Sequence, residues 1–151
     1  MSRNDRLRLD NQLCFALYAC AREVTKLYRP FLDELGLTYT QYVTMLVLWE
    51  TDEIPVKTLG QRLHLDSGTL TPLLKKLQAA GLIIRERNAA DERSVIVRLT
   101  EQGRALESLV LEIPDKVLCQ TSLPLEELSL LREQLHKLTE TIHQSEYSNL
   151  D

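Results

Sequence analysis

The sequence predicts a mainly α-helical fold with one small β-hairpin. Apolar residues recur at three- and four-residue spacing along most of the 151-residue chain, which is the period of helices with one buried face. Two runs rich in β-branched residues, Leu82 to Arg87 and Ser94 to Leu99, flank the polar stretch Asn88 to Arg93, and this pattern indicates a hairpin. A hydrophobic fraction of 44% and a charged fraction of 26% are typical of one globular domain at this length.

The first predicted helix runs from about Asp10 to Leu27, with Asp10 as its N-cap because a carboxylate can accept from the amides of the first turn. Its apolar face is formed by Leu13, Leu17, Ala21, Val24 and Leu27. Pro30 and Gly36 interrupt this pattern. A second helix is expected to begin at a capping box made by Thr38 and Gln41, and to close before Asp52 and Pro55.

Two helices joined by a tight turn are predicted next. Val56 to Leu63 forms a short helix, and His64-Leu65-Asp66 is short enough to be the turn. Asp66 or Ser67 then caps a helix that runs to Ala80, and Gly81 follows at a position that favours a left-handed backbone. The predicted hairpin comes directly after this helix.

The remaining chain is predicted to be helical. Thr100 caps a helix through about Leu118, which Pro114 is expected to bend or break. Leu125 to His143 forms the last helix, whose apolar face can pack against a partner helix. That face consists of Leu128, Leu131, Leu135, Leu138 and Ile142.

Charge is distributed unevenly, and this distribution favours nucleic-acid binding despite a net charge of −4. Residues 55 to 98 hold eight basic and four acidic side chains, so this span is +4 and the remainder is −8. A basic centre with acidic flanks can present one face to phosphates. No apolar run approaches the length of a membrane span or a signal peptide, so we expect a cytoplasmic protein with no membrane partner.

The predicted elements suggest how the chain would contact double-stranded DNA. The helix from Ser67 can enter the major groove, where its early residues lie nearest the base edges. Lys75 and Lys76 would contact the backbone, Arg93 near the hairpin tip suits the minor groove, and the other hairpin arginines can neutralise flanking phosphates. The full predicted set is Ser67, Thr69, Thr71, Lys75, Lys76, Arg85, Arg87, Arg93 and Arg98. Exposed Lys and Arg often serve solubility alone, so the order of elements carries more weight than any single charge.

The sequence resembles the MarR-type winged helix-turn-helix regulators over nearly its whole length. The resemblance rests on the stretch from Ser67 to Leu77, the step Ala80-Gly81-Leu82-Ile83, the motif Asp91-Glu92-Arg93-Ser94 and the following Thr100-Glu101-Gln102-Gly103. It implies one domain in which residues 37–100 bind a pseudo-palindromic operator while residues 1–36 and 101–151 join two chains as a homodimer. It also implies that Arg93 enters the minor groove and that Asp91 orients a wing arginine.

Cys14 has two possible roles on the residue pattern alone. A cysteine beside Leu13 and Leu17 on an apolar helix face is commonly an inert core residue. If Asp10 caps the helix, however, Cys14 lies in the first turn, where exposed amides and the helix dipole favour a thiolate that reacts with peroxides.

The stretch from Leu9 to Tyr18 resembles the start of the OhrR-type repressors, which sense organic hydroperoxides. This resemblance implies that Cys14 is the peroxide sensor, that Tyr28 and Tyr39, and less strongly Tyr18, support its thiolate, and that Cys119 is the resolving cysteine of the other subunit. Oxidation of Cys14 to a sulfenic acid, followed by a disulfide with Cys119, would then release the DNA. An external small thiol could replace Cys119 in this step.

Other chemistry and other functions are weighed against this interpretation. We expect Cys20 to be a core residue, and the three cysteines and His64, His136 and His143 lack the spacing of metal ligands, so no metal or cofactor is expected. Three rivals remain. One is a regulator of the same fold that is relieved by noncovalent binding of a small aromatic compound, with Cys14 structural. The second is a thiol peroxidase, although the chain lacks a CxxC motif and is not expected to be an enzyme. The third is a dimeric scaffold with incidental basic charge.

Overall fold

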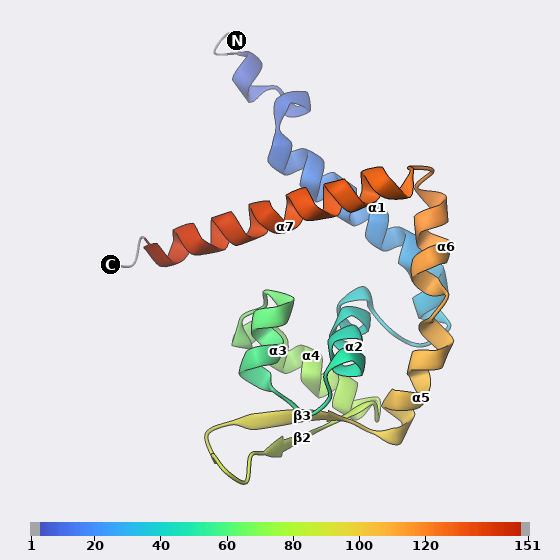
Figure 1. Cartoon of the computed structure of the whole chain (residues 1–151), viewed down its shortest axis with the longest axis vertical. Helices are drawn as coiled ribbons and strands as arrows, with labels where there is room; N and C mark the ends of the chain where they lie inside the picture. Colours follow the sequence, from blue (N-terminus) through green and yellow to red (C-terminus); the bar gives the residue numbers. More distant parts are fainter. Residues whose placement is uncertain (1–3, 149–151) are drawn as a thin grey trace. The chain divides into compact units, whose positions relative to one another are not determined.

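The computed structural model describes residues 4–148 and confirms the mainly helical class with a small sheet (Figure 1). The chain divides into two compact units, Met1–Pro114 and Asp115–Asp151, and each is described by itself. Within the first unit, the helices are η1 (Asp5–Leu7), η2 (Leu9–Asn11), α1 (Leu13–Asp33), α2 (Tyr39–Glu50), α3 (Val56–Leu63), α4 (Ser67–Ala79) and α5 (Glu101–Val110). Its strands are β1 (Ile54–Pro55), β2 (Ile83–Arg87) and β3 (Val95–Leu99).

The start of the first long helix differs from the prediction. Asp10 lies in η2 and does not cap α1, which begins at Leu13 with Gln12 as its N-cap residue. The Gln12 amide folds back and donates to the backbone carbonyls of Arg6 and Arg8, at 2.6 and 3.1 Å. These bonds connect the short helical turns η1 and η2 to the start of α1. Apolar periodicity in the sequence does not reveal such side-chain to backbone bonds.

Pro30 does not end α1, contrary to the expectation that it interrupts the helical pattern. The helix continues through Pro30 to Asp33, although a proline in a helix interior removes one backbone hydrogen bond. Leu32, beyond the proline, is only 2% exposed. Burial of this last turn against the rest of the unit compensates for the lost bond, because helices in proteins are stabilised mainly by packing.

The helix-turn-helix is confirmed in its details. Thr38 and Gln41 form the predicted capping box at the start of α2, and the Asp66 carboxylate caps α4 by accepting from the Thr69 amide at 2.8 Å. His64, with φ 53°, makes the left-handed turn after α3. The core between these helices contains Met45, Leu48, Leu59, Leu70, Leu74 and Leu77, none more than 1% exposed.

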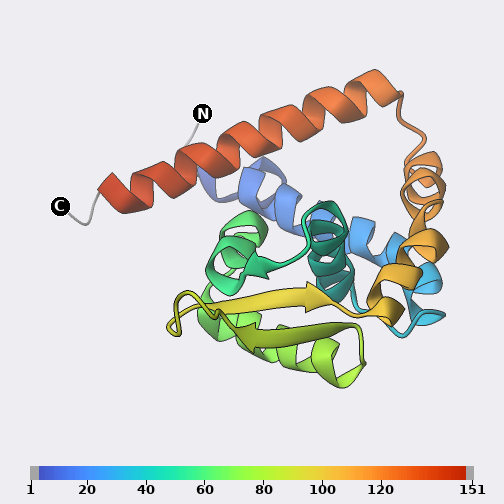
Figure 2. The same ribbon diagram turned by 60° about the horizontal axis from the view of Figure 1, so that its bottom comes forward.

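The sheet has a third strand that was not predicted. β1 pairs antiparallel with β3, with Ile54 opposite Val97 and Pro55 opposite Ile96, so the strand order is β1-β3-β2. Two residues, one of them proline, are too few to produce a period-two pattern in the sequence. The predicted hairpin pair β2 and β3 is confirmed, with Ile83 opposite Leu99 and Arg87 opposite Val95. In Figure 2 this hairpin runs alongside α4, and its loop extends beyond the helix.

Asp52, just after α2, links three elements of the first unit. Its carboxylate accepts from the amides of Glu53 and Leu99, at 2.8 and 2.9 Å, and from the guanidinium of Arg104, at 2.9 Å. Partial burial by itself would raise the pKa of Asp52, but these hydrogen bonds outweigh it and hold the pKa below its ordinary value. The ionised carboxylate therefore stabilises the junction of α2, β3 and α5.

We expect Asp52→Asn to lower the free energy of unfolding by about 1 to 2 kcal/mol at pH 7, because hydrogen bonds to a charged group are lost in part at a half-exposed site. Since the folded-state pKa is depressed, this stabilisation is present above the unfolded-state pKa of about 4 and is lost as the pH falls through the folded-state value. Urea unfolding at pH 7 and at pH 3 to 4 tests this. The difference between wild type and variant should shrink at acid pH, and a difference independent of pH would contradict it.

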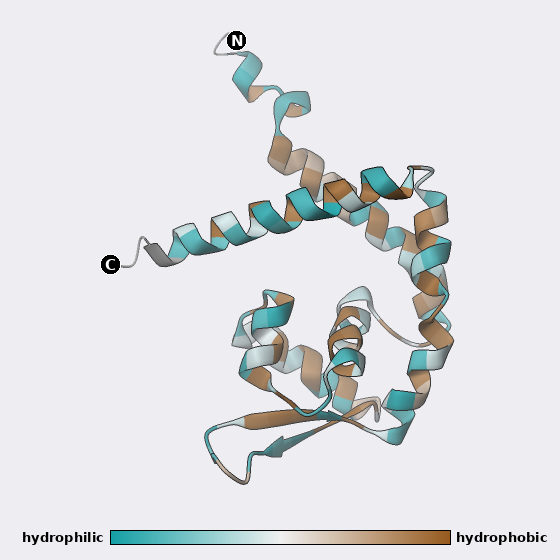
Figure 3. Ribbon diagram, in the orientation of Figure 1, coloured by the Kyte–Doolittle hydropathy of each residue, from teal (hydrophilic) through white to brown (hydrophobic). Residues whose placement is uncertain are grey.

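The C-terminal helices differ from the prediction mainly in their ends. The predicted helix after Thr100 breaks between Val110 and Ile113, one turn earlier than expected, and α6 (Ile113–Gln120) begins there with Pro114 in its first turn, where proline is tolerated. α7 (Leu125–Ser148) continues past His143. Hydrophobic and hydrophilic segments alternate along α7 (Figure 3). On its apolar face, Leu131 and Ile142 are 43% and 53% exposed.

Candidate nucleic-acid interface and thiol site

The exposed face of α4 carries the polar residues expected to meet DNA. Leu70, Leu73, Leu74 and Leu77 are buried on one side of this helix. Ser67, Thr69, Lys75 and Lys76 are exposed on the other faces, and Thr71 is half-buried. The helix therefore presents hydroxyl groups near its start and ammonium groups near its end, without exposing its apolar core.

The hairpin is attached to α4 by a side-chain contact. Arg85 on β2 donates through Nε to the Gln78 amide oxygen at 2.8 Å. This bond holds the Arg85 guanidinium beside α4, and Arg85 as a whole is half-buried. Arg98 instead forms an ion pair with Glu86 across the hairpin at 2.8 Å, while Arg87 is exposed. Gln78 is not among the site residues predicted from the sequence. The one signal for it there is its position on the exposed side of the helical period.

Asp91 shapes the hairpin loop that carries Arg93. Its carboxylate accepts from the Arg93 backbone amide at 3.1 Å, and its carbonyl accepts from the Ser94 amide at 2.9 Å. Asn88 also contributes, since its side chain accepts from the Ala90 amide at 3.0 Å. Asp91 thus orders the backbone of the turn, and Arg93 is exposed on it.

Cys14 is the second residue of α1 and is exposed in this chain. Its neighbours Leu13 and Phe15 are also exposed, at 64% and 42%. Cys14 therefore lies in the first helical turn, as expected, although the N-cap residue of α1 is Gln12 and not Asp10. Cys20, further along α1, is exposed as well, so the prediction of a core residue is wrong for the single chain. Leu32, near the end of α1, is the one residue of this helix that is buried in the chain's own core.

Tyr28, Tyr39 and Tyr42 form an aromatic cluster between α1 and α2. The ring centroids of Tyr28 and Tyr39 lie 5.0 Å apart, and those of Tyr28 and Tyr42 lie 5.6 Å apart. Burial raises the pKa of Tyr28, with a smaller contribution from Tyr39, and burial also raises the pKa of Tyr39. Burial raises the pKa of Tyr42 to about 12. These phenols remain protonated at neutral pH and can donate hydrogen bonds.

The tyrosine cluster is out of reach of Cys14 within one chain. Cys14 and Tyr28 lie on the same helix, α1. A rise of 1.5 Å per residue over this interval separates their Cα atoms by about 21 Å. A tyrosine side chain spans only a fraction of that distance. The structure therefore does not bring these sequence-predicted partners together in a single chain.

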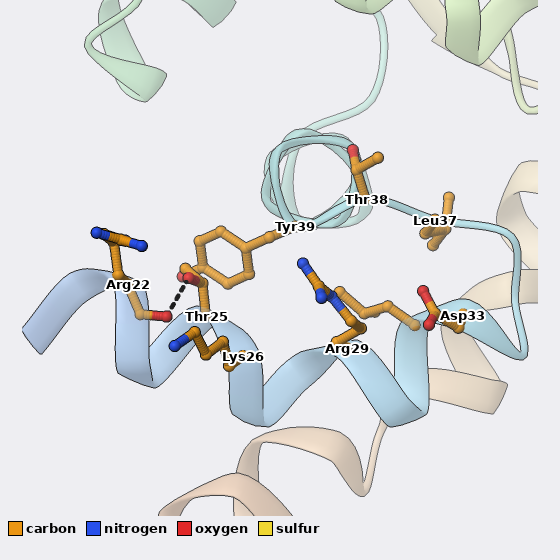
Figure 4. Close-up of a pocket in the computed structure, with 9 residues that line it drawn as sticks. Arg22, Thr25, Lys26, Arg29, Asp33, Leu37, Thr38 and Tyr39 are labelled. Atoms are coloured by element: carbon orange, nitrogen blue, oxygen red, sulfur yellow. Dashed lines mark hydrogen bonds between the residues drawn. The ribbon is translucent and has the colours of Figure 1, made fainter. Parts of the chain in front are cut away.

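A groove of about 400 Å³ borders the cluster along α1 (Figure 4). Arg22, Lys26 and Arg29 project from α1 into this region, and the ring of Tyr39 extends toward them from α2. Lys26 is paired with Glu23 at 2.7 Å. The Arg22 guanidinium lies 5.5 Å from the centre of the Tyr18 ring, which is mostly exposed. Tyr18 therefore stacks with a cation and does not join the other tyrosines.

Cys119 lies near the end of α6 and is exposed. Among residues 4–148, no group of three or more His, Cys, Asp or Glu side chains is arranged to hold a metal ion. In the same described part of the chain, no helix is long and apolar enough to cross a membrane.

Comparison with known proteins agrees with this arrangement of elements. Residues 26–108 match a family described as transcriptional regulator SarA/Rot. The organic hydroperoxide resistance transcriptional regulator of Bacillus subtilis (strain 168) is 49% identical over 140 residues, which cover 93% of this chain and 95% of that protein. These relatives are transcriptional regulators and not enzymes, as expected from the sequence.

Solved structures show the same similarity. Reduced AbfR bound to DNA matches with a TM-score of 0.76 at 34% identity, covering 93% of this chain and 99% of that one. The disulfide form of AbfR, a protein of Staphylococcus epidermidis, matches with a TM-score of 0.64 at 35% identity, covering 91% of this chain and 96% of that one. The likeness thus extends over nearly the full length of both chains.

Proposed function

The chain belongs to the MarR-type family of winged helix-turn-helix DNA-binding transcriptional regulators and is related to the organic hydroperoxide resistance regulators, and from this premise we propose that it is a dimeric repressor that senses organic hydroperoxides through Cys14. The observation that carries the proposal is the position of Cys14. It is exposed in the first turn of α1, and its Cα atom lies about 21 Å along this helix from that of Tyr28, the nearer end of the tyrosine cluster in sequence. A second chain is therefore needed to supply the tyrosines.

In the proposed dimer, Tyr28 and Tyr39 of one chain face Cys14 of the other. Their raised pKa values keep both hydroxyl groups protonated, so each can donate to a thiolate. The first-turn position adds unpaired backbone amides that favour negative charge. Tyr18, which stacks with Arg22 on α1, would border this site and not bind the sulfur directly. The tyrosines would thus stabilise the reactive form of the thiol.

The exposed apolar residues favour such a dimer. Leu7 and Leu9 before α1, and Leu13 and Phe15 at its start, are exposed in the single chain. On the apolar face of α7, Leu131 and Ile142 are exposed as well, and the other apolar residues of that face are half-buried. Surfaces of this kind on a soluble fold mark interfaces, because large exposed apolar patches are uncommon on monomers. A second copy of the chain would bury them.

The proposed chemistry begins when the Cys14 thiolate attacks one peroxide oxygen. An S–O bond forms, the O–O bond breaks, and the alcohol leaves after taking up a proton, so the cysteine becomes a sulfenic acid. The thiol of Cys119 from the other chain then displaces hydroxide, which leaves as water, and a disulfide forms. AbfR, which is similar, is known in reduced, overoxidised and disulfide forms, and this supports the sequence of states.

The disulfide would act on DNA binding through geometry. It requires Cα atoms about 4.4 to 6.8 Å apart, so it restricts where the helices that carry the two cysteines can lie. In the dimer, two α4 helices must be about 34 Å apart to enter successive major grooves of a pseudo-palindromic operator. A change in this spacing would release the DNA.

The DNA contacts in this proposal follow the exposed residues. Early α4 residues would meet base edges, late α4 lysines and hairpin arginines would meet phosphates, and the loop ordered by Asp91 would place Arg93 in the minor groove. Base and phosphate contacts from α4 would come from Ser67, Thr69, Thr71, Lys75 and Lys76. Contacts from the hairpin would come from Arg85, Arg87, Arg93 and Arg98.

The test is fluorescence anisotropy of the reduced protein on its own upstream DNA at fixed salt, before and after a stoichiometric organic hydroperoxide. Wild type should dissociate and should bind again after reduction, whereas Cys14→Ser should stay bound. Salt is held constant because phosphate contacts dominate the affinity. Cys119→Ser, with mass spectrometry of the oxidised chain, then shows whether the intersubunit disulfide is required. Peroxide-insensitive binding by wild type would overturn the sensing role.

A second candidate is regulation by noncovalent binding of a small aromatic acid. The groove beside Tyr39 favours this candidate because three cations, Arg22, Lys26 and Arg29, line it together with one carboxylate, Asp33, and the excess positive charge could hold a carboxylate. In that case Cys14 would be structural. DNA binding that ignores hydroperoxide in both wild type and Cys14→Ser, but weakens with an aromatic carboxylate, would establish it.

A further inference from the structure

We propose that a groove on the side of α4 opposite the hairpin binds a phosphate of the DNA backbone. The groove has a volume of about 240 Å³ and lies between the start of α2 and α4. Thr38, the N-cap residue of α2, and Thr40 in its first turn line one side, and Thr69 and Lys76 line it from α4. The proposal rests on the DNA-binding function and adds residues at the start of α2, none of which is among the DNA-contacting residues predicted from the sequence.

The groups in this groove suit an anion that accepts several hydrogen bonds. The hydroxyl oxygens of Thr38 and Thr40 lie 3.2 Å apart, so one hydroxyl donates to the other and the second hydrogen is available to a ligand. Among the described residues that line the groove, Lys76 is the only charged one, and no carboxylate is present. A phosphate oxygen would therefore meet hydroxyl donors and one ammonium group without repulsion.

The groove is placed where a DNA strand would run. Successive residues of a helix are about 100° apart, so Lys76 and Gln78 lie about 200° apart around α4. Gln78 faces the hairpin, because it binds Arg85 at 2.8 Å. Lys76 therefore faces away from the hairpin, and Thr69, about two turns earlier, shares its side.

A helix that occupies the major groove has a phosphate strand on each side, since the groove is about 12 Å wide and a helix with its side chains is about as thick. The hairpin side of α4 offers Arg85 to one strand. The other side offers Thr38, Thr40 and Lys76 to the second strand. The start of α2 would thus set how deeply α4 is seated and would fix its register on DNA.

The test uses full-length protein and a DNA duplex selected from a random pool for tight binding to wild type. One phosphate at a time is replaced by an uncharged methylphosphonate, and binding is measured for wild type, Thr40→Val and Lys76→Gln. Wild type should lose affinity at one phosphate per half-site, on the strand away from the hairpin. Both variants should bind the unmodified duplex about tenfold less tightly and should no longer respond to that replacement.

The salt dependence separates the two groups. Lys76→Gln should reduce the slope of log affinity against log salt by about 0.9 for each chain bound, while the neutral change Thr40→Val should leave the slope unaltered. Lys137→Gln removes an exposed lysine from α7 and should behave as wild type. Thr40 and Lys76 are exposed, so both variants should fold, which circular dichroism checks. Methylphosphonate profiles that are the same for wild type and both variants would overturn the proposal.

Discussion

A mixed dimer of a Cys14→Ser chain and a Tyr28→Phe/Tyr39→Phe chain is expected to react with organic hydroperoxide at nearly the wild-type rate per remaining cysteine. The one remaining Cys14 belongs to the chain that carries Tyr28→Phe and Tyr39→Phe. In the proposed dimer this cysteine faces the intact tyrosines of the chain that carries Cys14→Ser. The homodimer of Tyr28→Phe/Tyr39→Phe should react about 10- to 100-fold more slowly, because two hydrogen bonds to the thiolate are lost.

The measurement is stopped-flow or quenched-flow labelling of free thiol, with the mixed dimer purified through two different affinity tags. Phenylalanine keeps the ring contacts of the aromatic cluster, in which Tyr28 and Tyr39 lie 5.0 Å apart, so the variants change hydroxyl groups and little else. Tyr42→Phe is the matched control from the same cluster, since no role with Cys14 is proposed for it. If the mixed dimer is as slow as the phenylalanine homodimer, the tyrosines do not act across the subunits.

Gly103→Ala is expected to destabilise the first unit by at least about 3 kcal/mol, which is the upper end of overpacking effects. A Cβ atom at Gly103 would lie 2.1 Å from the backbone carbonyl oxygen of Leu82, and Leu82 is buried. This contact joins the first turn of α5 to the start of the hairpin. The Gly103 carbonyl also accepts from Trp49 at 2.9 Å. Neither backbone can move without breaking these contacts.

Gly103→Ala should lower both the thermal unfolding temperature and the affinity for DNA, because the displaced segment carries the hairpin. Gly36→Ala is the comparison. Gly36 has a positive φ of 66° but open space around its Cβ direction, so only the left-handed backbone penalty of about 1 to 2 kcal/mol applies. If Gly103→Ala lowers the free energy of unfolding by no more than Gly36→Ala does, the backbone near Leu82 adjusts easily and the prediction is wrong.

Local features of the fold could be predicted from the sequence because neighbouring residues determine them. The capping box of Thr38 and Gln41, the cap at Asp66 and the left-handed Gly81 each depend on a few adjacent residues. The helix periods and the hairpin also follow from local patterns. Two local signals were overridden: hydrogen bonds from the Gln12 side chain replace the cap expected at Asp10, and burial of Leu32 carries α1 past Pro30.

The sequence by itself determined the family, the order of elements and the residue types at the candidate sites. Only the tertiary structure decided which distant residues meet: Asp52 with Leu99 and Arg104, Gln78 with Arg85, and β1 with β3. It also decided that Cys14 and Tyr28 lie too far apart on α1 to meet within one chain. The physical reason is that such contacts depend on how elements pack in space, and packing leaves no periodic or short-range pattern in the chain.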